Sequence, residues 1–102
     1  MQMDRNANLE GKGKYALVRL RNITTDDEAH GLLRRLEELG HLDWGLRGAA
    51  DEFFVIKLKD KFAAPALDAY ADAAESDDLT WACQVRGIAV RASERADKKM
   101  PA

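Results

Sequence analysis

Cysteine is nearly absent from this chain of 102 residues, in which Cys83 is the only one. A lone cysteine excludes an internal disulfide, so the fold depends on its core. Long apolar runs are also missing, since none approaches the roughly 20 residues that a membrane-spanning helix needs. The first residues, Met1 to Asn6, lack the apolar stretch of a secretory signal. Together these absences predict a soluble, cytoplasmic protein without a membrane partner.

An excess of one charge is missing too. Lys and Arg number 16 and Asp and Glu number 18, which gives a formal net charge of -2 and a pI near 5.7. Such a balance provides no general attraction to nucleic acid or to anionic lipid. A local basic patch is still compatible with it.

The residue patterns that support catalysis or metal binding are absent. His30 and His41 have no second His or Cys at the spacing of metal ligands. Cys83 alternates with Trp81 and Val85, which predicts a buried thiol on a strand and not a nucleophile. We therefore predict no catalytic residue, no metal site and no cofactor.

What the chain does contain is enough apolar sequence to build a core. Hydrophobic residues make up 46% and charged residues 33%, as expected of a globular domain. The polar residues 1–13 read as a flexible N-terminal segment and residues 93–102 as a flexible charged tail. Residues 14–92 are then predicted to form a single α+β domain.

The periodic segments follow the order strand, helix, strand, strand, helix, strand. Thr25 and Glu28 form a capping box ahead of leucines at helical spacing, and Gly40 ends that helix. Asp60 caps a second helix, which runs to about Glu75. The predicted strands cover residues 15–21, 42–47, 52–59 and 79–90, although residues 88–96 are also compatible with a helix.

This βαββαβ order resembles the ferredoxin-like α/β plait. The resemblance implies a four-stranded antiparallel sheet with both helices on one face. Alternation along the strands assigns a mixed apolar and basic set to the open face of that sheet. The candidate interaction surface consists of Tyr15, Leu17, Arg19, Arg47, Phe53, Val55, Lys57, Ala82 and Arg86.

Several functions fit such a face. We expect a small binding or regulatory domain, rather than an enzyme, that forms a homodimer through the open sheet face, because exposed apolar patches mark interaction sites. A protein partner or a small anionic ligand is a further interpretation. A third is single-stranded nucleic acid, because the layout resembles an RNA-recognition motif. Residues 51–58, however, begin with two acidic residues where that motif has a basic-Gly-aromatic opening. A small enzyme with its site at a dimer interface, gathering His41 or Tyr15, is the fourth.

Overall fold

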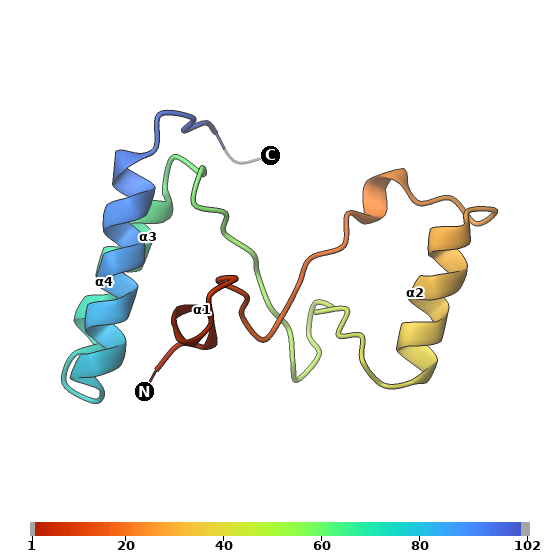
Figure 1. The fold of residues 1–102 in the computed structure, drawn as a ribbon, viewed down its shortest axis with the longest axis horizontal. Coiled ribbons are helices and arrows are strands. Elements are labelled where there is room, and N and C mark those ends of the chain that lie inside the picture. Colours follow the sequence, from red (N-terminus) through yellow and green to blue (C-terminus); the bar gives the residue numbers. More distant parts are fainter. Residues whose placement is uncertain (1, 101–102) are drawn as a thin grey trace. The chain divides into compact units, whose positions relative to one another are not determined.

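The computed structural model describes residues 2–100 and is helical (Figure 1). The helices are α1 (Asp4–Ala7), α2 (Glu28–Glu38), α3 (Ala63–Ala74) and α4 (Leu79–Glu94), with a single 3-10 turn, η1 (Leu20–Asn22). The chain divides into two compact units. One contains Met1–Tyr15 and Ile56–Ala102, and the other is Ala16–Val55.

The predicted ferredoxin-like plait is wrong. Within residues 2–100 there is no strand and therefore no four-stranded sheet. The one β interaction described there is an isolated parallel bridge between Asp60 and Lys99. Three of the segments predicted as strands, at residues 15–21, 42–47 and 52–59, are mostly irregular chain broken by turns.

The fourth predicted strand is the helix α4, and the reason lies in its spacing. The residues it buries recur every three or four positions, as on one face of a helix: Ala82, Val85, Ile88, Ala89 and Ala92. Three of these five are alanines, which have the highest helix propensity of all residues. The alternation of Trp81, Cys83 and Val85 covers so few residues that it fits the period of a strand as well as that of a helix. The helix continues through Glu94, so most of the ambiguous stretch 88–96 is helical as well.

Both predicted helices exist, with shifted N-terminal ends. α2 begins at Glu28 and is capped by Asp27, whose carboxylate accepts a hydrogen bond from the backbone N–H of Ala29 at 3.0 Å. Thr25 is therefore not the cap. Gly40 follows α2 with φ +79°, and the N–H of His41 donates to the carbonyl of Leu36 at 3.0 Å. A left-handed glycine after the last turn is a common way to end a helix.

The first unit is organised around the pairing of α3 and α4, which lie side by side (Figure 1). Its hydrophobic cluster contains Met3, Ala71, Ala82, Val85 and Ile88. Most of the fully buried residues are alanines, so the two helix backbones approach closely. A hydrogen bond connects Met3 to α4: its backbone N–H donates to the side-chain oxygen of Gln84 at 2.8 Å.

The second unit contains α2 and the loop that follows it. Leu33 is the one buried side chain of α2. The indole N–H of Trp44 donates to the carboxylate of Glu37. Gly45 has φ +63°, and a Cβ built there would overlap the ring of Phe53. Both the backbone conformation and the aromatic ring therefore require glycine at this position.

Candidate interaction surface

The residues predicted to form an open sheet face have different environments in the structure. Ala82 is fully buried in α4. Arg86 also lies on α4, and its guanidinium donates to Asp72 at 2.9 Å and to Glu75 at 3.1 Å, so these carboxylates raise its pKa. The other seven residues are exposed: Tyr15, Leu17, Arg19, Arg47, Phe53, Val55 and Lys57. No sheet in residues 2–100 gives them a common face.

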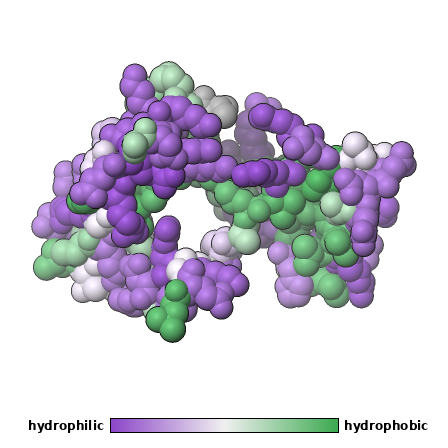
Figure 2. Space-filling view, turned by 45° about the horizontal axis from the view of Figure 1, so that its top comes forward, coloured by the Kyte–Doolittle hydropathy of each residue, from purple (hydrophilic) through white to green (hydrophobic). Residues whose placement is uncertain are grey.

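The residues expected to point inward are exposed as well. Val18 is 50% exposed and Phe54 is 87% exposed, and Ile56, at 42%, is as open as its neighbour Val55, at 45%. Alternation separates two faces only when a strand is held in a sheet. Here apolar residues assigned to both sides are exposed, and Figure 2 shows hydrophobic residues, in green, on the surface of the molecule.

Residues 53–56 form the most concentrated of these exposed runs, which we call the apolar segment. All four residues are strong β-formers: Phe53, Phe54, Val55 and Ile56. Figure 1 draws this light-green stretch as an open, uncoiled trace. Among the described residues, none of its four backbone N–H or C=O groups takes part in a hydrogen bond. Exposed β-formers with an unpaired backbone are the features of an unprotected sheet edge.

Opposite charges stand at the two ends of the apolar segment. Asp51 and Glu52 precede it, and Lys57 and Lys59 follow it. Lys59 lies near Lys99, whose backbone N–H donates to the Lys59 carbonyl at 2.9 Å. Repulsion from Lys99, and then from Lys57, holds the pKa of Lys59 below its usual value. The C-terminal end is therefore a cluster of cations that an acidic group stabilises.

Two other exposed apolar runs lack opposite charges at their two ends. Residues 15–20 are flanked by Lys12, Lys14 and Arg21 and contain Arg19, so the charge is basic throughout. Leu32 and Leu36 on α2, and Leu39 at its C-cap, are exposed at helical spacing. Their backbone is satisfied within the helix, apart from its ends.

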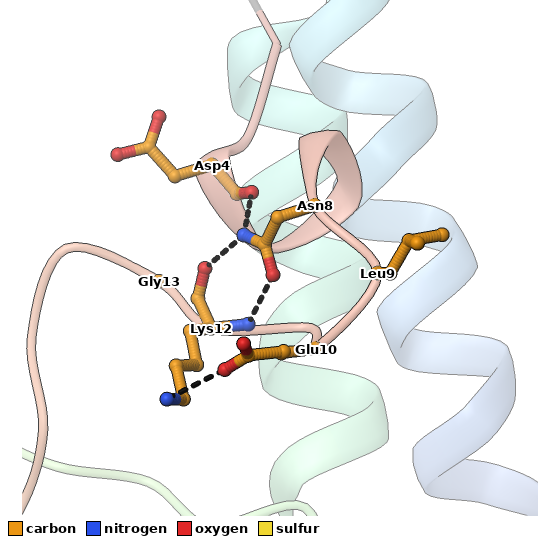
Figure 3. Close-up of a pocket in the computed structure, with 6 residues that line it drawn as sticks. All are labelled: Asp4, Asn8, Leu9, Glu10, Lys12 and Gly13. Carbon is orange, nitrogen blue, oxygen red and sulfur yellow. Dashed lines mark hydrogen bonds and ion pairs between the residues drawn. The ribbon is translucent and has the colours of Figure 1, made fainter.

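A hollow in the N-terminal segment is lined by Asp4, Asn8, Leu9, Glu10, Lys12 and Gly13 (Figure 3). The side-chain amide of Asn8 donates to the carbonyls of Asp4 and Lys12, both at 2.7 Å, and its oxygen accepts from the N–H of Lys12 at 3.0 Å. The Lys12 ammonium lies 2.6 Å from the Glu10 carboxylate. These polar groups are occupied in closing the loop, and the side chain of Leu9 points outward.

The residues considered for chemistry stay apart. His30 is half-buried on α2 and His41 is exposed beyond its end. Cys83 is exposed on α4, so the expectation of a buried thiol is wrong, because that expectation assumed a strand. Within residues 2–100, no cluster of three His, Cys, Asp or Glu side chains is arranged to hold a metal ion.

Searches with known proteins add no relative. No protein-family model, no curated protein and no solved structure matches this chain significantly. In the part of the chain that the structure describes, the helices are all too short or too polar to cross a bilayer.

The surface predicted from the sequence overlaps in part with the apolar segment and its flanking charges. It included Phe53, Val55 and Lys57, but Phe54 and Ile56 were placed in the core. It left out Asp51, which was assigned to a turn. The change in side-chain charge from acidic before the apolar segment to basic after it was a signal in the sequence that could have identified this surface.

Proposed function

We propose that this protein is a binding module that works by self-association, with the apolar segment at residues 53–56 as the contact surface. The observation that carries the proposal is the exposure of Phe54, at 87%, within a run of β-formers whose backbone is unpaired. Burying a phenylalanine that is this exposed contributes about 1.5–3 kcal/mol.

A second copy of this chain is the occupant that the charges favour. The segment carries acid at one end and base at the other, so two copies offer each other complementary groups. A purely basic or purely acidic ligand would meet like charge at one end. We propose a cytoplasmic setting for this activity, which the exposed free thiol of Cys83 supports, because reducing compartments keep such thiols unpaired.

Sedimentation velocity across the micromolar range tests the proposal. The wild type should shift from monomer to dimer as its concentration rises. Phe54→Ser should weaken the dimer by at least about tenfold, as expected for an interface aromatic. Phe62→Ser is the matched control, because Phe62 is 49% exposed and lies outside the apolar segment. A wild type that remains monomeric, or equal weakening by both substitutions, rules the proposal out.

A further inference from the structure

We propose that two copies of this chain join by antiparallel strand pairing of residues 52–56, with Phe54 at the two-fold axis and Asp51 of each copy, at the end of the preceding turn, opposite Lys57 of the other. This inference depends on the proposed self-association and specifies its geometry. It concerns main-chain pairing as well as side chains, because the backbone of the apolar segment has no hydrogen-bond partner among residues 2–100.

The irregular backbone of residues 52–57 defines the length available for pairing. Leu58 and Lys59 already belong to a turn in which the N–H of Asp60 donates to the carbonyl of Lys57 at 2.9 Å. On the other side, the N–H of Glu52 donates to Ala49 at 3.2 Å. The pairing is therefore centred between these two turns, at Phe54 or close to it.

Charge decides the direction of the two strands. In a parallel, in-register pair, Asp51 would face Asp51 and Lys57 would face Lys57, and like charges directly opposite are destabilising. In the antiparallel pair centred on Phe54, Asp51 faces Lys57 at both ends. The cations around Lys57 and Lys59, which within one chain are repelled by Lys99 more than they are stabilised by Asp97, then gain a further acidic neighbour.

The same register gives consistent side-chain pairs on both faces of the two-stranded ribbon. Residues directly opposite each other share a face. One face carries Phe54 against Phe54 and Glu52 against Ile56, and the other carries Phe53 against Val55 between the two Asp51–Lys57 pairs. Aromatic pairs and aromatic to β-branched pairs are among the stabilising cross-strand combinations. A two-fold pair is also closed, so growth stops at two copies along this edge.

A charge-exchange experiment tests the orientation. Asp51→Lys makes both ends of the segment basic, and Lys57→Asp makes both ends acidic. Neither residue forms a side-chain hydrogen bond or ion pair within residues 2–100, so neither substitution removes a contact of the monomer. Each variant alone should self-associate about tenfold more weakly than the wild type at low salt. An equimolar mixture should form a heterodimer at close to the wild-type affinity.

Asp43→Lys is the matched control, because it makes the same charge change at an exposed acidic residue outside the segment. Sedimentation and native mass spectrometry measure each species, and circular dichroism confirms that each variant is folded. A wild-type dimer that Phe54→Ser weakens but the two charge variants leave unchanged overturns the antiparallel pairing and leaves the proposed function standing. A mixture that remains monomeric, or a wild type that forms growing polymers, also overturns it. A monomeric wild type ends both proposals.

Discussion

Asp78 shows how one side chain defines the start of a helix. Its carboxylate accepts a hydrogen bond from the backbone N–H of Trp81 at 3.0 Å, which occupies one of the unpaired donors at the N-terminus of α4. This bond stabilises the charged form, and so it lowers the pKa of Asp78. A serine, asparagine or aspartate can cap a helix, but the aspartate alone makes the cap sensitive to pH.

The residue scale therefore yields a pH prediction for Asp78→Asn. A carboxyl whose pKa is lower in the folded state stabilises the fold above its unfolded pKa and loses that contribution as the pH falls through the folded pKa. Urea unfolding at a series of pH values should show the wild type more stable than Asp78→Asn at neutral pH. The difference should shrink below about pH 4.

The comparison with the asparagine variant separates the contribution of Asp78 to the pH dependence of stability from that of the other acidic residues. The bidentate contact of Arg95 with Asp97, at 2.8 and 2.7 Å, also lowers the pKa of Asp97. Asp97 titrates in both proteins, so its contribution cancels in the difference. A gap between wild type and variant that is constant from neutral to acid pH contradicts the role of the charged cap.

At the scale of elements, the pairing of α3 with α4 depends on small side chains. Ala63, Ala71 and Ala82 are fully buried, and Ala92 is 1% exposed. Alanine allows the two helices to approach closely, but it contributes little buried area for each residue. Arg86 joins the helices at the edge of this contact by its bonds to Asp72 and Glu75.

A pair of leucine substitutions on α3 tests this packing. Ala71→Leu inserts three carbons into a contact that has no room for them, and it should lower the free energy of unfolding by about 1–3 kcal/mol. Ala73→Leu makes the same change two positions along the same helix, where the side chain is exposed. Its effect should stay within about 0.5 kcal/mol.

Urea denaturation measures both variants at one protein concentration, chosen low enough to keep the chain monomeric. Equal losses from Ala71→Leu and Ala73→Leu would show that the α3–α4 contact is looser than the buried alanines indicate. A gain in stability from Ala71→Leu would contradict close packing directly.

At the scale of the whole molecule, the proposed self-association should be linked to folding. A partner that binds the folded chain but not the unfolded one raises the apparent stability as its concentration increases. The apolar segment has acidic residues at one end and basic residues at the other, which we propose a second copy would pair with. The stability of this protein should therefore depend on how much of it is present.

The expected result is a thermal midpoint that rises with protein concentration in the wild type. Differential scanning fluorimetry or calorimetry over the micromolar range measures it. Asp51→Lys is the matched control, because it weakens the proposed pairing without removing a contact of the monomer, and its midpoint should be nearly constant. A flat wild-type midpoint, or equal slopes in both proteins, contradicts the linkage.

The fold could be predicted from the sequence where the signals are local. The leucines of α2, the glycine that ends it and the alanines of α3 are read within a few residues of each other. The strands could not be predicted in this way. Phe53, Val55 and Ile56 favour an extended chain, but a strand also needs a second chain segment to bond, and residue preference does not supply one.

The same contrast between local and long-range signals applies to the candidate surface. Tyr15, Leu17, Phe53 and Val55 are exposed, but residues 2–100 do not contain the sheet face to which they were assigned. Ala82 is buried because its segment coils into α4 and presents that residue to α3. Residue type and short-range alternation could not distinguish exposed from buried positions here, since the strand period and the helix period both fit residues 81–85.

The sequence by itself determined where two of the helices lie, which apolar run has charges of opposite sign at its ends, and that no disulfide closes the chain. Tertiary structure alone decided that Ala82 is buried, that the β-forming segments have no strand partner within residues 2–100, and that Phe54 faces solvent. The physical reason is that helix hydrogen bonds close within four residues, whereas a β-strand and a buried face both require atoms from distant parts of the sequence.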